Sequence, residues 1–210
     1  HEPGVAVVDG EPMVFAPVSS TQDADECALV ALDATDGDER WRYDVPQPNC
    51  TIHAVADPAV ADTDGDGDRE VLAPTTEDEV LVAGALEGEI ETRLPLTDYG
   101  YSRPTVADID EDGDRETVAV DVLGSVRVFA QDGSLEWRAD REAYVWATPV
   151  VDDVDADGRT EIVVADRRGY VTAFAPDGSL LWNRSHGAGL IATWMTSGDL
   201  DDDPALEYVV

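Results

Sequence analysis

The chain has no lysine, and this shortage of cationic side chains limits what it can bind. All 13 cationic residues are arginines, against 47 aspartates and glutamates, which gives a formal net charge of −34 in 210 residues. Such a surface repels phosphate, so we expect no nucleic-acid partner. Attraction to anionic membranes is disfavoured for the same reason.

Long apolar runs and helical periodicity are also lacking. No run approaches the ~18 residues needed to cross a bilayer, so we expect no direct membrane insertion in this segment. The chain begins at His1 without a signal-like segment, so any targeting peptide is expected to have been removed or left out. Because 43% of the residues are hydrophobic, the chain should nevertheless bury a core and is no disordered acidic tail.

Catalytic groupings are poor. The three histidines are scattered, the two cysteines form no CxxC pair, and no glycine-rich phosphate loop is present. Paired carboxylates occur everywhere, so they indicate nothing by themselves. We therefore expect no enzyme, and a functional carboxylate has to be recognised by its pattern.

One acidic pattern does recur. Four segments fit D-x-D-x-D-(G/P)-x-x-E, and we call them loops 1 to 4: residues 62–70, 108–116, 153–161 and 199–207. Their first aspartates are spaced by 46, 45 and 46 residues. Randomly placed acids would not keep this register four times, so the loops belong to an internal repeat.

Each acidic loop is followed by further strand-like sequence. Residues 124–137 and 169–182 both read as an alternating strand, an Asp-Gly turn and a second strand that contains a tryptophan. Residues 28–41 form a further copy, and 80–92 a degenerate one with Thr92 in place of tryptophan. We expect Trp41, Trp137 and Trp182 to wedge between repeats.

Four short strands in about 45 residues are typical of a propeller blade. The sequence predicts an all-β fold, a β-propeller of four-stranded antiparallel blades in a single domain over 1–210. The blades are expected at about 3–45, 55–95, 101–141 and 146–185, with a partial blade at 190–210. The first blade lacks the acidic loop and has a tight Asp9-Gly10 turn instead.

About four and a half blades do not close a ring unless further strands are supplied. An open edge at 207–210 invites pairing. We expect the chain to be part of a longer one, or the edge to pair with a neighbouring subunit.

The loop pattern predicts calcium sites. Ca²⁺ takes six to eight hard oxygen ligands, and acids at positions 1, 3, 5 and 9 with a carbonyl at position 7 can supply them. Mg²⁺ prefers smaller octahedral cages, and the soft ligands that suit Zn²⁺ are absent. The expected donors are Asp62, Asp64, Asp66, Asp68 and Glu70; Asp108, Asp110, Asp112, Asp114 and Glu116; Asp153, Asp155, Asp157, Arg159 and Glu161; Asp199, Asp201, Asp203, Ala205 and Glu207.

Loop 4 has Pro204 where the others have glycine, and proline restricts φ to about −65°. We therefore expect three calcium ions, with a fourth only if this loop tolerates the proline. The alternative is that the loops are solvated acidic turns, but crowded carboxylates without a cation would repel one another on folding.

These repeats resemble the FG-GAP/VCBS type of calcium-loop β-propeller, the architecture of the integrin α-subunit head. The resemblance implies that Ca²⁺ binds between the first two strands of a blade. The A-x-D-x-x-x-G-x-x-x-W stretch at 31–41 is also similar to PQQ-like, quinoprotein-type repeats. The acidic, lysine-free composition resembles proteins of extreme halophiles, whose carboxylates keep the surface hydrated in salt.

The two cysteines and two asparagines fit an exported protein. Cys27 and Cys50 are expected to form one disulfide, with two buried free thiols as the alternative. Asn49 and Asn183, the only asparagines, both lie in N-x-S/T sequons after the last strand of a blade, where glycosylation is expected. Cys50 lies inside the first sequon, which counts against modification there.

Aromatic residues gather in the segments that enter each blade. We expect a ligand face where they could stack on sugar rings; the alternative is packing between blades. The residues are His53, Tyr99, Tyr101, Tyr144, Trp146 and Trp194.

Together these features predict an extracellular, calcium-binding propeller for recognition, adhesion or structural presentation at the cell surface. The expected partner is a glycan or protein, with self-assembly through the open edge as a further prediction. One alternative is a quinoprotein-like or polysaccharide-active enzyme domain. Another is a surface-layer or filament subunit.

Overall fold

The computed structural model describes residues 1–19, 26–141, 143–187, 195–198 and 207–209. These residues form strands and turns without any helix, and the strands make four four-stranded antiparallel sheets and one two-stranded sheet. The predicted all-β fold of four-stranded antiparallel blades is confirmed. None of the described residues forms a helix with the length and hydropathy needed to cross a membrane.

Each sheet is built from consecutive strands. Blade 1 contains β1 (Gly4–Val8), β2 (Glu11–Val18), β3 (Ala28–Asp33) and β4 (Glu39–Asp44). Blade 2 contains β5 (Ala59–Ala61), β6 (Glu70–Thr75), β7 (Glu79–Gly84) and β8 (Ile90–Pro95). Blade 3 contains β9 (Thr105–Ala107), β10 (Glu116–Val120), β11 (Ser125–Phe129) and β12 (Leu135–Asp140). Blade 4 contains β13 (Val150–Asp152), β14 (Glu161–Ala165), β15 (Tyr170–Phe174) and β16 (Leu180–Ser185), and β17 (Thr196–Gly198) pairs with β18 (Glu207–Val209).

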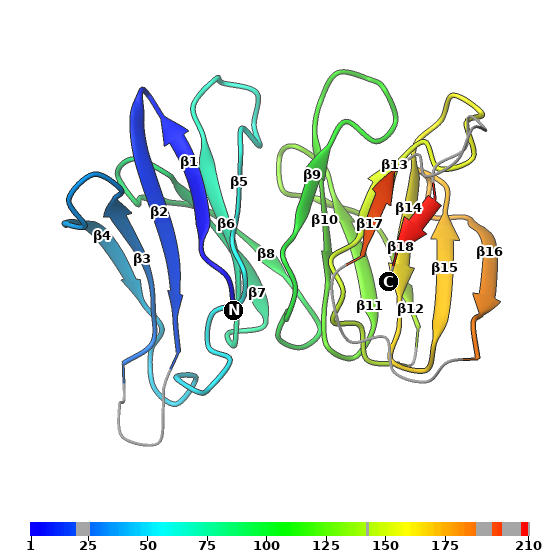
Figure 1. Ribbon diagram of the computed structural model, residues 1–210, viewed down its shortest axis with the longest axis horizontal. Coiled ribbons are helices and arrows are strands. Elements are labelled where there is room, and N and C mark those ends of the chain that lie inside the picture. Colours follow the sequence, from blue (N-terminus) through cyan, green and yellow to red (C-terminus); the bar gives the residue numbers. More distant parts are fainter. Residues whose placement is uncertain (20–25, 142, 188–194, 199–206, 210) are drawn as a thin grey trace.

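The blades stand side by side in chain order (Figure 1). The first strands of neighbouring blades contact each other, β1 with β5, β9 with β13, and β13 with β17. The middle strands β6, β10, β11 and β14 are buried throughout, whereas the fourth strands β12 and β16 expose most of their residues to solvent. Thus the first strand of each blade is innermost and the fourth is outermost.

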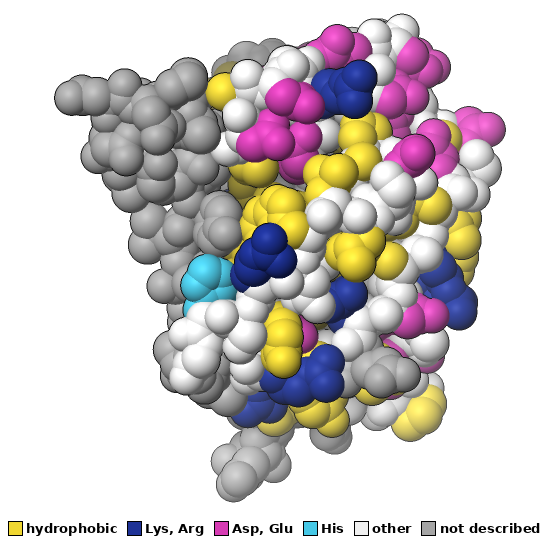
Figure 2. Space-filling model, turned by 90° about the vertical axis from the view of Figure 1, so that its right-hand side faces the viewer, with side chains coloured by type: hydrophobic (Ala, Val, Ile, Leu, Met, Phe, Trp, Pro, Cys, Tyr) yellow, Lys and Arg dark blue, Asp and Glu magenta, His cyan; other side chains and the backbone are white. Residues whose placement is uncertain are grey.

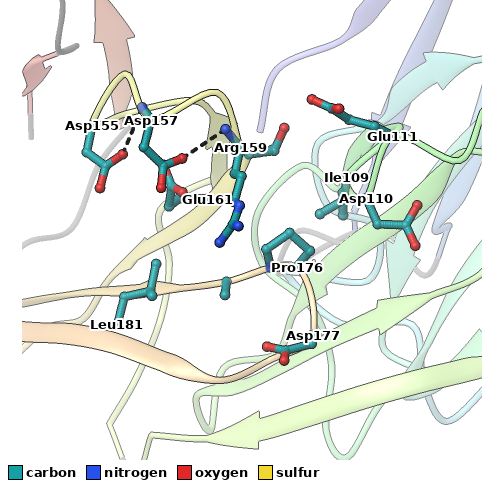
Figure 3. A pocket seen from close by; sticks show the side chains of 12 residues that line it. Ile109, Asp110, Glu111, Asp155, Asp157, Arg159, Glu161, Pro176, Asp177 and Leu181 are labelled. Carbon is teal, nitrogen blue, oxygen red and sulfur yellow. Dashed lines mark hydrogen bonds between the residues drawn. The ribbon is translucent and has the colours of Figure 1, made fainter.

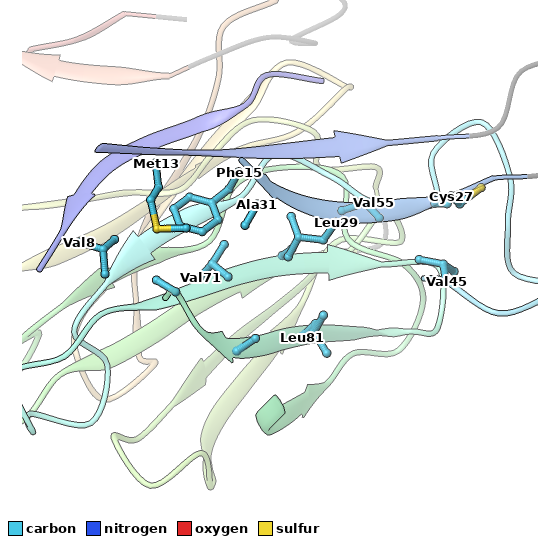
Figure 4. Close-up of a cluster of buried hydrophobic side chains, with 14 residues drawn as sticks. Val8, Met13, Phe15, Cys27, Leu29, Ala31, Val45, Val55, Val71 and Leu81 are labelled. Carbon is cyan, nitrogen blue, oxygen red and sulfur yellow. The ribbon is translucent and has the colours of Figure 1, made fainter. Parts of the chain in front are cut away.

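The hydrophobic core lies between blades. Figure 4 shows one cluster in which Met13, Phe15 and Leu29 of blade 1 meet Val71 and Leu81 of blade 2. All five side chains are almost completely buried. Because each such layer belongs to two blades, a blade depends on its neighbours for its buried apolar surface.

Tryptophans on the outer strands join neighbouring blades. Trp41 of β4 donates from Nε1 to the carbonyl of Ala85 in blade 2 at 2.9 Å. Trp137 of β12 donates in the same way to Pro176 in blade 4 at 2.7 Å. Each ring lies directly over a glycine of the next blade's outer turn, and a Cβ there would come within 2.5 to 2.7 Å of the ring. These two side chains wedge between blades. Trp182 packs against a cluster that combines core residues of blade 4 with Met195, which precedes β17.

One expected loop position was wrong. Asn183 lies inside β16, where it pairs with Thr172 of β15, and does not follow the strand. The antiparallel pairing of β15 with β16 extends to Tyr170 and Ser185, so Asn183 stays within the paired part of the strand. Asn49 does lie in the segment after β4.

Candidate metal centres

Loops 1 to 3 connect the innermost strand of a blade to the next strand, β5 to β6, β9 to β10 and β13 to β14. In each loop three carboxylate oxygens from different residues lie within 4.8 Å of one another. The clustered acids are Asp62, Asp64 and Asp66; Asp108, Asp110 and Glu116; Asp153, Asp155 and Glu161. Each of the three clusters could therefore hold a metal ion.

The glutamate at position 9 is the first residue of a buried strand and points back into its own loop. Glu70, Glu116 and Glu161 are only 2 to 4% exposed. Each accepts a hydrogen bond from the backbone amide at position 2, and the distances are 2.6, 2.8 and 3.0 Å. A buried carboxylate held in this way closes the inner side of the loop.

The loop backbone curls around the aspartate at position 1. In loop 2 the amide of Gly113 donates to Asp108 at 3.1 Å, and in loop 3 Gly158 donates to Asp153 at 3.0 Å. Position 4 adopts left-handed backbone geometry even where it is not glycine, with φ of 65° at Glu111 and 59° at Ala156. This conformation is uncommon for such residues.

The electrostatics of the clusters favour a cation. Burial raises the pKa of Glu116; the hydrogen bond from Ile109 opposes this, and the neighbouring Asp110 carboxylate raises it further. Burial and nearby aspartates act in the same direction on Glu70 and Glu161. Several carboxylates in one partly buried loop repel one another, and a divalent ion would remove that repulsion.

The donor set consists of oxygen alone. Carboxylates and carbonyls are the ligands that Ca²⁺ and Mg²⁺ prefer, and no cysteine or histidine belongs to any of the three clusters. The residues present therefore fit a hard divalent cation.

The three clusters do not use the same set of expected ligands. Position 5 joins the cluster in loop 1, as Asp66, whereas position 9 joins it in loops 2 and 3. Asp112 and Asp157, at position 5, instead accept the amides of Asp114 and Arg159. Asp68 at position 7 of loop 1 likewise donates its amide to position 5. In loop 4, Asp199, Asp201, Asp203 and Ala205 lie outside the described residues, and Glu207 begins β18.

Blade 3 holds loop 1 through two side chains that the sequence analysis missed. Arg115 donates to the carbonyl of Asp62 at 3.0 Å, and Gln131 donates to the carbonyl of Asp64. Gln131 also accepts the amide of Arg115 at 3.3 Å. Blade 4 has Thr160 and Pro176 at the matching positions, so this clamp has no equivalent on loop 2.

A hollow of about 470 Å³ lies between loops 2 and 3 (Figure 3). Arg159 extends into it from loop 3 toward Pro176, and Glu111 and Asp110 border it from loop 2. Its lining is mainly acidic and includes Asp110 from the cluster of loop 2, and Asp155 and Glu161 from that of loop 3.

At the opposite end of the blades, several of the expected aromatic residues form a row. The ring of Tyr101 lies 5.0 Å from His53 and 5.4 Å from Trp146, and Trp146 lies 6.4 Å from Tyr144. The backbone carbonyl of Tyr99 accepts the amide of Val122. Trp194 lies outside the described residues.

The cysteines are joined in the structure. A disulfide links Cys27, at the end of the segment entering β3, to Cys50 in the connection between blades 1 and 2. Cys27 is 3% exposed and belongs to the core cluster of blades 1 and 2.

Comparisons with known proteins agree with this architecture. Residues 2–206 match a family model described as that of the outer membrane protein assembly factor BamB. A rhamnogalacturonan lyase of Bacillus licheniformis is similar in structure, with a TM-score of 0.70 at 20% identity, over 99% of this chain and 45% of the lyase. The BBS1N chain in a complex with ARL6DN is similar with a TM-score of 0.59 at 11% identity, over 97% of this chain and 71% of that one. The sequence found no match among curated proteins.

Proposed function

The chain belongs to the PQQ_2 family, that of the outer membrane protein assembly factor BamB. From this membership and from the acidic clusters of loops 1 to 3, we propose a calcium-stabilised propeller that recognises a partner without catalysis. The setting that we propose is the outside of a cell. The family describes an assembly factor, which is a binding role, and a similar role suits a row of packed blades with no catalytic grouping in its sequence.

The observation that carries the proposal is the repetition of one ligand geometry in three successive blades. Aspartates at positions 1 and 3 approach each other in each of loops 1 to 3, and the glutamate at position 9 of each of these loops is buried. We identify the ion as Ca²⁺ because its flexible shell of six to eight oxygens suits a loop with five potential donors. Extracellular calcium would keep such sites filled.

Chelation tests this proposal. A ligand that binds only the folded state at a hundred times its Kd stabilises that state by about 2.7 kcal/mol per site. Removing calcium with EGTA at constant ionic strength should lower the melting temperature by many degrees, and added Ca²⁺ should restore it. Mg²⁺ at the same concentration should restore less. An unchanged melting curve in EGTA would refute the proposal.

The family match also favours a second candidate, a quinoprotein-like enzyme. The A-x-D-x-x-x-G-x-x-x-W stretch at 31–41 is of the PQQ-like type. Such an enzyme should reduce a redox dye when supplied with the quinone, Ca²⁺ and an alcohol or sugar. Turnover in this assay would decide for the enzyme and against a purely recognising role.

A further inference from the structure

Arg167 lacks a carboxylate partner although acids outnumber arginines 47 to 13 in this chain. It takes part in none of the ion pairs among the described residues. Its Nε is buried without a hydrogen-bond acceptor. Arg103, Arg127 and Arg141 share such a buried, unpaired Nε, but of these four only Arg167 lines the hollow described below, where an anion from outside can reach it.

Aromatic rings hold this guanidinium in place. Its central carbon lies 4.0 Å from the ring centre of Trp146 and 5.7 Å from that of Tyr144. The backbone amide of Arg167 donates to the carbonyl of Tyr144 at 2.9 Å, which ties blade 4 to the connection between blades 3 and 4. Stacking uses the flat face of the guanidinium and leaves its in-plane N–H groups available to a carboxylate.

A hollow of about 460 Å³ opens beside this arginine. It lies between blades 3 and 4 at the end opposite the acidic loops, because the turns after β10 and β14 border it. Its lining consists of Leu123, Ala143, Tyr144, Arg167 and Arg168. Tyr144 is 50% exposed and Leu123 47% exposed, so a flat apolar surface lies next to two cationic groups.

On one face of the molecule (Figure 2), acidic and cationic side chains are separated in a similar way. Figure 2 shows acidic side chains gathered at the upper end of one face and arginines among hydrophobic side chains in its lower half. Arg168 donates from Nη2 to the backbone carbonyl of Arg141 at 3.0 Å, and its carboxylate partner among the described residues, Asp166, lies 3.8 Å away. An anion therefore meets less repulsion at this end than near the loops.

We propose that this hollow binds a carboxylate-bearing sugar, such as a uronate unit of an acidic polysaccharide. Arg167 and Arg168 bind the carboxylate through charge-assisted hydrogen bonds, and Tyr144 and Leu123 contact the C–H face of the sugar ring. The row from Tyr144 to His53 continues across the blades. His1 packs against Tyr101 and His53, and Arg167 lies over Trp146, so the half-exposed Tyr144 is the ring most open to an adjacent sugar unit. An acidic peptide has no flat face to use this row. The inference rests on the proposed recognition function and specifies its ligand.

Calorimetric titration tests the proposal with tetragalacturonic acid as the probe and its methyl ester as a neutral control. The calcium-loaded protein should bind the acid and not the ester, in a buffer salty enough to screen the net charge. The Arg167→Gln variant should weaken binding about tenfold or more, the loss expected for a charge-assisted hydrogen bond. Arg138→Gln is the matched control, because Arg138 on β12 is exposed and ion-paired with Asp140. This variant removes the same charge and should leave the affinity unchanged.

Equal binding of acid and ester, or equal losses in the two arginine variants, would overturn the proposal. So would tighter binding of a polyglutamate peptide, which would make the hollow a peptide site. Melting curves with and without EGTA on the same samples distinguish a failure of the saccharide site from a failure of the proposed calcium-dependent function. Calcium-dependent stability without any saccharide binding refutes this inference alone, whereas loss of the calcium effect refutes the proposed function.

Discussion

Replacing Gly88 with alanine should destabilise the propeller far more than the same change at Gly37. Both glycines lie in the turn between the third and fourth strands of a blade, and both have left-handed backbone geometry, with φ of +74° and +81°. A Cβ at Gly88 would lie 2.5 Å from Cδ2 of Trp41, whereas a Cβ at Gly37 would have no atom within 4 Å. The two substitutions thus share the backbone cost and differ only in the contact with the tryptophan.

The backbone cost of alanine in this conformation is about 1 kcal/mol. Forcing a methyl group into the packed ring adds about 2 kcal/mol. We expect Gly37→Ala to lose about 1 kcal/mol and Gly88→Ala about 3 kcal/mol of unfolding free energy, measured by urea denaturation in saturating calcium. In a Trp41→Leu background the Gly88→Ala cost should fall toward that of Gly37→Ala. Equal losses for the two alanine variants in the native background would show that Trp41 does not wedge between blades 1 and 2.

Three further outcomes are expected. Serine at both Cys27 and Cys50 should cost about 3 kcal/mol in urea denaturation, because the disulfide closes a loop with a sequence separation of 23; no loss on reduction would contradict this. Gln131→Ala should weaken calcium binding most at loop 1, whose Asp64 carbonyl it bonds, less at loop 2, whose Arg115 amide it accepts at 3.3 Å, and not at loop 3; titration calorimetry would contradict the clamp if all three sites weakened equally, or none did. The pKa of Asp33 is lowered to about 2, first because Thr35 donates its hydroxyl. The stabilisation is therefore present above the ordinary value near 4 and is lost as pH falls toward 2, and an NMR titration should show this pKa rising in a Thr35→Val variant.

The propeller could be predicted from the sequence because its signals are local and repeated. Each blade has its own turn glycines, its own strand alternation and, in three blades, its own acidic loop. The Asp9-Gly10 turn between β1 and β2 is observed, with φ of 50° and 85° at its two residues. Signals of this kind need no knowledge of the neighbouring blade.

Contacts between blades could not be predicted in the same way. Arg115 reaches Asp62 across 53 positions of sequence, and Gln131 reaches Asp64 across 67. Their roles depend on the angle between two sheets, which a repeat pattern does not specify. The position of Asn183 could not be predicted for a related reason. The end of β16 at Ser185 depends on pairing with β15, which the residues of β16 alone do not indicate.

The number of calcium ions bound per chain tests the central claim most directly. Equilibrium dialysis against radioactive Ca²⁺ at high ionic strength should give three ions for the native protein, or four if loop 4 also binds. A Glu116→Gln variant keeps the volume of the buried side chain in loop 2 and removes its charge, so it should bind one ion fewer. Fewer than one ion per chain, or an undiminished number in the variant, would contradict the account.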